Sequence, residues 1–139
     1  PSQLRRGTCG RRPCCGGAHE GPKLVRCTWG AVFYVLGAIR VSWPPYRRWH
    51  GAELTADNRR SLFIPPGFAH GFVSLTDHAE MYYMISVAPA PEFSRGLRLA
   101  DPALAIEWPL CPVVISCPDA ALPSLAVPRG RFCPHSRCY

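Results

Sequence analysis

Lysine, charged residues and long apolar runs are all scarce in this sequence. Lys23 is the single lysine among 16 basic residues, and charged side chains make up 18% of the 139 residues. No uninterrupted apolar run reaches the roughly 18 residues that a membrane-spanning helix needs. The first 12 residues contain four arginines and no apolar segment of the kind found in a secretory signal peptide. We therefore expect a soluble, cytoplasmic protein with no membrane partner.

Arginine, proline and cysteine are instead more frequent than in an average domain. The formal charge is +7, and the chain holds 16 prolines and 8 cysteines. A strongly basic chain can bind nucleic acid or another anionic ligand. The arginine pairs accompany no helix-turn-helix and no aromatic-rich recognition strand, so we expect no nucleic-acid partner. A hydrophobic content of 47% over 139 residues fits one globular domain.

Cysteines and histidines gather at both ends of the chain, where they could bind zinc or form disulfides. The two groups are Cys9, Cys14, Cys15 and His19, and Cys133, His135 and Cys138. Their spacings match no common zinc arrangement of the C-x2-C or H-x3-H type. Disulfide frameworks belong to secreted chains, and no secretion signal is visible. We expect neither a zinc site nor disulfides, and no cofactor.

The composition divides the chain into three parts. Residues 1–22 are rich in cysteine, glycine and arginine, residues 23–119 contain most of the aromatic side chains, and residues 120–139 read as an irregular tail. Only the middle part has enough apolar surface to offset the chain entropy lost on folding. We predict that 23–119 is the folded core, and we hypothesise that both ends derive from frame-shifted or wrongly assigned coding sequence.

The middle part alternates short strand-like runs with turn residues. Each run is roughly 5 to 8 residues long, is rich in β-branched and aromatic types, and recurs about every 8 to 12 residues. No window has the periodicity of an amphipathic helix. The pattern predicts an all-β sandwich or barrel. The runs are 23–29, 31–36, 38–40, 47–54, 60–64, 70–75 and 79–86.

The most specific segment is Ile64-Pro-Pro-Gly-Phe-Ala-His-Gly-Phe72. Its Pro-Gly turn places His70 at the start of a strand, where the imidazole would face a barrel interior. On its own, such a histidine is more often a hydrogen-bonded core residue than a functional one. Further motifs accompany it: Lys23-Leu-Val-Arg-Cys27, Arg40, Trp49-x-Gly51-x-x-Leu54, Asn58-x-Arg60, Asp101-Pro102 and Ile106-Glu-Trp-Pro109. Through these motifs, residues 23–119 resemble the dTDP-4-dehydrorhamnose 3,5-epimerase family.

The resemblance implies an all-β double-stranded β-helix (a cupin jelly roll) that is incomplete at its N-terminus. It also implies a homodimer and a dTDP-linked 4-keto-6-deoxyhexose as substrate, epimerised at C3 and C5 in nucleotide-sugar (dTDP-rhamnose or deoxysugar) biosynthesis. Pro65-x-Gly67-x-x-His70 is similar to the second cupin motif, but the sequence has no His-x-His…Glu cluster of the metal-binding cupins. One imidazole provides too few ligands, so we expect no metal.

The family's chemistry assigns roles to particular residues. Such a reaction needs a base to remove a proton, a cation to hold the enolate oxygen, and an acid to reprotonate the opposite face. By resemblance, Lys23 stabilises the enolate and His70 binds the sugar. Tyr83, 13 residues after His70, corresponds to the general acid, and Asp119 to the aspartate that orients the base. The structural alternatives are an exposed lysine at a strand start for Lys23 and a core aromatic for Tyr83.

Several positions depart from the family pattern. Pro13 stands ten residues before Lys23, where the resemblance places the general-base histidine, and proline cannot take up a proton. Gly10 stands in place of a substrate-binding arginine, and Tyr34 in place of an acidic residue that helps to position the sugar histidine. We therefore expect an impaired epimerase. The alternatives are a non-catalytic cupin module that binds a nucleotide sugar, and a non-functional gene fragment.

Overall fold

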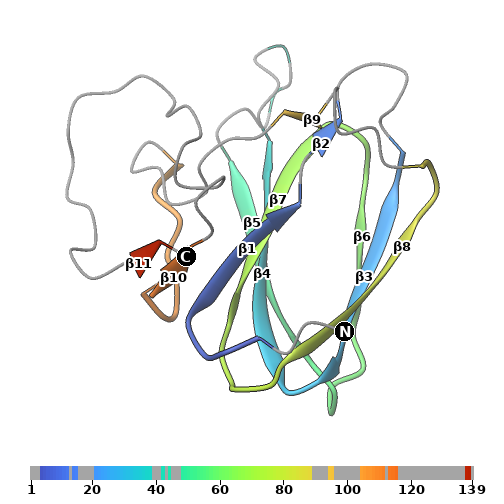
Figure 1. The fold of residues 1–139 in the computed structure, drawn as a ribbon. Coiled ribbons are helices and arrows are strands. Elements are labelled where there is room, and N and C mark those ends of the chain that lie inside the picture. Colours follow the sequence, from blue (N-terminus) through green and yellow to red (C-terminus); the bar gives the residue numbers. More distant parts are fainter. Residues whose placement is uncertain are drawn as a thin grey trace.

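The computed structural model describes residues 4–12, 14–15, 21–38, 42, 44, 48–88, 94–95, 104–111, 113–115 and 137–138. Within these ranges every regular element is a β-strand (Figure 1). The strands are β1 Thr8–Arg12, β2 Cys14–Cys15, β3 Lys23–Trp29, β4 Ala31–Ala38, β5 Trp49–Thr55, β6 Ser61–Ile64, β7 Phe68–Ser74, β8 Glu80–Ile85, β9 Ser94–Arg95, β10 Val114–Ile115 and β11 Arg137–Cys138. The prediction of an all-β chain is confirmed. None of the described residues belongs to a helix that could cross a membrane.

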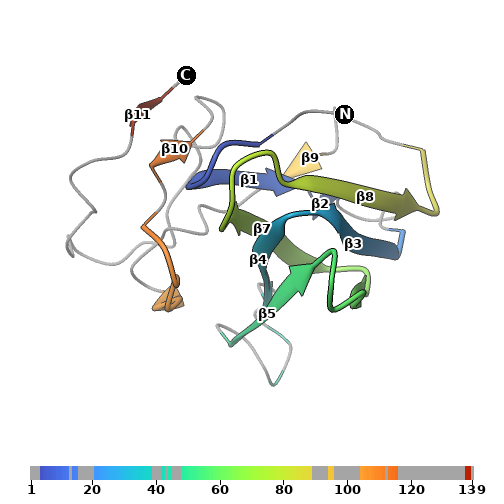
Figure 2. The same cartoon turned by 90° about the horizontal axis from the view of Figure 1, so that it is seen from below.

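Two sheets face each other across the interior (Figure 1, Figure 2). The larger has the strand order β11-β10-β1-β7-β4-β5 and the smaller the order β6-β3-β8, while β2 and β9 form a short separate pair. The chain passes from the smaller sheet to the larger between β3 and β4, and again between β6 and β7. This repeated exchange of strands between two facing sheets is a jelly-roll arrangement.

The period-2 pattern of β3 decides which of its side chains fill the interior. Val25 and Cys27 are fully buried. Leu24, which precedes Val25, and Arg26, which lies between the two buried residues, are exposed. The turn into β4 depends on Gly30, which has a φ of 72°. A Cβ at that position would collide with the hydroxyl of Thr76, so glycine fits there for both backbone and steric reasons.

Apolar side chains pack on both faces of the larger sheet. The main core, between the sheets, contains Val25, Cys27, Val32, Tyr34, Leu36, Leu54, Ile64, Phe72 and Ala79. A second cluster forms where Leu104 packs on Ala69 with Trp108 beside it. Trp108 also meets Phe33 edge to face, with ring centroids 6.2 Å apart. Phe33 alternates with the inward Tyr34, so the second cluster lies on the outer face.

Two features differ from the expectations drawn from the sequence. β1 lies outside the predicted strands, yet it pairs with β7 so that Gly10 is opposite Phe72 and Arg12 is opposite His70. The ladder uses backbone groups, so the edge of β7 accepts a strand that has few apolar side chains. Cys111 forms a disulfide, contrary to our expectation. That expectation rested on the missing secretion signal, which carries no information about which cysteines the fold brings together.

Candidate active site

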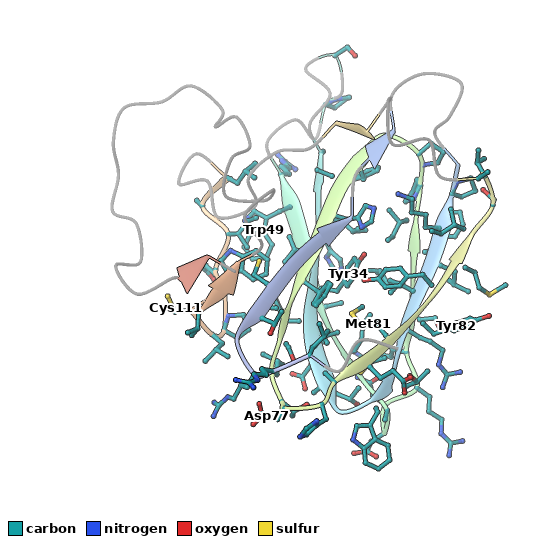
Figure 3. The ribbon with its side chains drawn as sticks, in the orientation of Figure 1. Tyr34, Trp49, Asp77, Met81, Tyr82 and Cys111 are labelled. Atoms are coloured by element: carbon teal, nitrogen blue, oxygen red, sulfur yellow. The ribbon has the colours of Figure 1, made fainter. Side chains whose placement is uncertain are left out.

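Four side chains from four strands meet between the two sheets. They are Lys23 from β3, Tyr34 from β4, His70 from β7 and Tyr83 from β8. Each occupies an inward position of its strand, because successive side chains alternate between the two faces. Figure 3 shows Tyr34 in the space between the sheets, whereas Tyr82, the neighbour of Tyr83, points away from that space.

His70 is the centre of this group, and both of its ring nitrogens have a polar partner. Its side chain is only 2% exposed. The Tyr34 hydroxyl lies 2.7 Å from Nδ1, and the Lys23 Nζ lies 3.2 Å from Nε2. An ammonium can only donate and a phenol can donate or accept, so the tautomer of His70 decides the direction of the Tyr34 contact. Lys23 and Tyr34 are thus both in contact with one buried imidazole.

Aromatic contacts fix the position of the Tyr34 hydroxyl. The Tyr34 ring is fully buried and stacks on His70 at 5.9 Å and on Phe72 at 6.2 Å, measured between ring centroids. Tyr83 is a further neighbour of this ring, tilted against it with a centroid distance of 6.5 Å. Tyr83 is partly exposed, and its hydroxyl donates to Met81 Sδ at 3.5 Å. A thioether is a weak acceptor, so this bond holds the Tyr83 hydroxyl loosely.

The structure brings together three of the residues predicted from the sequence. Lys23 and His70 are in direct contact, and Tyr83 is connected to them through the Tyr34 ring. Asp119 and Pro13 lie outside the described residues, so their predicted roles stay predictions. Tyr34 was noted only as a departure from the family pattern. Its inward position among the β4 core residues was the one signal that could have placed it in the site.

The position of Gly10 is closely packed against the site. Gly10 is opposite Phe72 in the β1–β7 ladder. A Cβ built on Gly10 would lie 2.7 Å from Cζ of the Phe72 ring, and that ring stacks on Tyr34. A longer side chain at this position therefore requires Phe72 to move, which disturbs the ring that supports Tyr34.

Cys27 lies in the same core, but its surroundings indicate a structural role rather than a catalytic one. Burial raises the pKa of its thiol above the ordinary value, and backbone hydrogen bonds around it offset this only in part. Its Sγ lies 3.1 Å from the Trp29 carbonyl oxygen and 3.4 Å from that of Gly30. The thiol is therefore a protonated donor to the β3–β4 turn. Over the part of the chain that the structure describes, no three or more metal-binding side chains gather.

Comparisons with known proteins agree with the fold. The family model for dTDP-4-dehydrorhamnose 3,5-epimerase matches residues 16–127. A relative of that name from Sinorhizobium fredii is 43% identical over 104 residues, which are 74% of this chain and 53% of the relative. This chain spans about half the length of the curated relatives it matches.

Solved structures of the same kind have the same fold. The dTDP-4-dehydrorhamnose 3,5-epimerase from Elizabethkingia anophelis superimposes with a TM-score of 0.84 at 28% identity, covering 89% of this chain and 69% of that one. The dTDP-6-deoxy-D-glucose-3,5-epimerase from Legionella pneumophila, in complex with dTDP-4-keto-L-rhamnose, gives 0.79 at 36% identity, covering 87% and 64%. The predicted cupin jelly roll is confirmed. Since the family model covers most of its length, this chain belongs to the dTDP-4-dehydrorhamnose 3,5-epimerase family.

Proposed function

We propose that this chain is a dTDP-sugar 3,5-epimerase-like protein that takes a dTDP-4-keto-6-deoxyhexose into the space between its sheets. The observation that carries the proposal is the hydrogen-bonded array of Tyr34, His70 and Lys23 in that space. Membership of the family and the dTDP-4-keto-L-rhamnose bound to the L. pneumophila relative support it. The cytoplasmic location stays a prediction from the sequence.

The array suits the chemistry of a carbon next to a ketone. Loss of the proton at C3 or C5 leaves an enolate whose negative charge lies on the C4 oxygen. In this proposal the Lys23 ammonium faces that oxygen, because a fixed cation shielded from water stabilises an oxyanion strongly. Tyr83 then donates its proton to the carbon from the opposite face, the enolate electrons form the new C–H bond, and the C4 ketone returns.

Proton removal is the step that this chain performs poorly in our proposal. Pro13 takes the place of the general base, and general-base catalysis contributes about 10²–10⁴-fold to such a step. The same residue favours a second function, a non-catalytic module that holds a dTDP-sugar, because binding uses the cation and the hydrogen-bond donors but needs no base.

Two measurements separate these functions. Deuterium wash-in at C3 and C5 of dTDP-4-keto-6-deoxyglucose in D2O, followed by NMR, reports proton removal, and a thermal shift with dTDP reports binding. We expect stabilisation by dTDP together with wash-in about 10²–10⁴-fold slower than in a relative that has the base. Stabilisation without wash-in supports the binding module. Absence of both overturns the two functions together, and wash-in at the rate of the relative contradicts the impairment.

Three variants test the assigned roles. Lys23→Met keeps the chain length but removes the ammonium, so we expect it to abolish wash-in. Tyr83→Phe removes the proposed acid and should reduce inversion at carbon more than it reduces wash-in. Tyr82→Phe is the matched control, because its hydroxyl is on the 56% exposed neighbour that faces away from the site. Equal effects of the Tyr83 and Tyr82 variants would contradict the role of Tyr83.

We further propose that the chain pairs with a second copy through the outer face of the smaller sheet. Phe63, Leu24 and Met84 are in register across β6, β3 and β8, and all three are exposed. Two copies bring identical rows together about a two-fold axis, so each row covers the other. Light scattering after size exclusion should show a dimer that Met84→Lys converts to a monomer. The exposed Arg59→Lys is the control, and a monomeric unaltered chain overturns the pairing.

A further inference from the structure

Tyr34 stands where the resemblance to the family places an acidic residue, and its hydroxyl contacts the Nδ1 of His70 at 2.7 Å. Tyr34 is 0% exposed and His70 is 2% exposed, so bulk water does not compete for this bond. In such surroundings the partners of a histidine decide which ring nitrogen carries its hydrogen. The chemical group at position 34 therefore affects which ring nitrogen of His70 is protonated.

The groups that face His70 come from each strand around it. Lys23 approaches Nε2 from the opposite sheet, and Tyr34 approaches Nδ1 from the neighbouring strand β4. Tyr83 of β8 lies behind the Tyr34 ring. On the other side, β1 places Arg12 opposite His70 in the ladder. The imidazole is thus in contact with a lysine side chain and a phenol.

A phenol and a carboxylate act on such an imidazole in opposite ways. A carboxylate at Nδ1 favours the positively charged imidazolium, which would donate from Nε2 and would repel the Lys23 ammonium. A phenol oxygen accepts the Nδ1 hydrogen without adding a negative charge. The imidazole then stays neutral, and its Nε2 lone pair is directed at Lys23.

We propose that Tyr34 is a positioning residue that locks His70 as the neutral Nδ1–H tautomer and thereby makes His70 an acceptor for Lys23. Resting on the proposed function, this assigns the whole positive charge at the C4 oxygen to Lys23. His70 orients that ammonium and does not donate a proton to the enolate.

The test reads the tautomer directly, in the full chain and without substrate. Long-range ¹H–¹⁵N NMR of histidine-labelled protein distinguishes a protonated from an unprotonated ring nitrogen, and the His70→Gln spectrum identifies the His70 signals by their loss. We expect Nδ1 of His70 to be protonated and Nε2 to be unprotonated at neutral pH. A protonated Nε2 in the unaltered chain overturns the proposal, whichever variants fold.

Variants then assign the tautomer to Tyr34. Tyr34→Phe keeps the stacked ring and removes the oxygen, so we expect the His70 ¹⁵N signals to shift, because the Nδ1 hydrogen loses its acceptor. Tyr82→Phe should leave them unchanged, because its hydroxyl is exposed on the outer side of β8. Unchanged His70 signals in folded Tyr34→Phe contradict the role of Tyr34. The dTDP binding and wash-in measurements are separate from the NMR measurement. The proposed function can therefore fail while the tautomer is confirmed, and the tautomer can be wrong while the proposed function holds.

Discussion

The stability of the chain should depend very unequally on the hydroxyl groups of its three tyrosines in β4 and β8. The Tyr34 hydroxyl is fully enclosed and bonds to an imidazole that is itself 2% exposed. Tyr83 is partly exposed, and its hydroxyl donates to a thioether at 3.5 Å. Tyr82 is 56% exposed. Replacement by phenylalanine removes one oxygen in each case and keeps the ring, so the three variants differ in surroundings alone.

The expected magnitudes follow from those surroundings. Tyr34→Phe leaves the Nδ1–H of His70 buried without its acceptor, and a buried donor without a partner costs about 1–3 kcal/mol. For a chain of this size, 1 kcal/mol corresponds to roughly 3–4 °C in Tm, so Tm should fall by about 3–12 °C. Tyr83→Phe should cost less than about 1 kcal/mol, because a thioether is a weak acceptor. Tyr82→Phe should stay within about 0.5 kcal/mol of the unaltered chain.

The assay is thermal unfolding followed by circular dichroism at equal protein concentration, so that any pairing between copies affects all three variants alike. The order of destabilisation should be Tyr34, then Tyr83, then Tyr82. A Tyr34→Phe variant that unfolds at the same temperature as Tyr82→Phe refutes the reasoning, because the hydrogen bond at Nδ1 would then make no net contribution. A double variant, Tyr34→Phe with His70→Phe, tests the cause. Removal of both partners should cost less than the sum of the single changes.

Three further results are expected. Gly10→Ala should lower stability by about 1–3 kcal/mol in urea unfolding, because the new Cβ meets the buried Phe72 ring. Gly37→Ala should be less harmful by comparison, because a Cβ there would make only an ordinary contact with the Ala69 carbonyl oxygen at 4.0 Å. Cys27 should resist alkylation in the folded chain, and its raised pKa means that stability falls as the pH rises through 9.0, where an unburied thiol ionises first. Pro13→His should raise deuterium wash-in by about 10²–10⁴-fold.

The strands of the middle region could be predicted because their period-2 pattern is local. Val25 and Cys27 are buried and Leu24 is exposed, as alternation requires. The inward direction of His70 followed from the Pro-Gly turn before its strand. β1 could not be predicted in this way, because its pairing with β7 uses backbone groups and its own side chains carry no alternating apolar pattern.

The site was predictable only in part. Lys23 and His70 were proposed as site residues through a resemblance, and they are in contact although 47 residues separate them in the sequence. The Tyr34–His70 bond was missed, because no local pattern shows that two inward side chains on neighbouring strands will meet with their polar ends. Such a contact depends on the strand register, which sequence periodicity does not specify.

The array of Lys23, Tyr34 and His70 does not depend on the residue at position 13 under our proposal. Lys23, Tyr34 and His70 are positioned by β3, β4 and β7, whose packing uses core residues of the middle region. Pro13, the position at which the resemblance places the general base, follows β1 in the sequence, and β1 ends at Arg12, the ladder partner of His70. Pro13→His leaves the strands that hold Lys23 unchanged. For this reason wash-in, rather than dTDP binding, is the property that this variant should change.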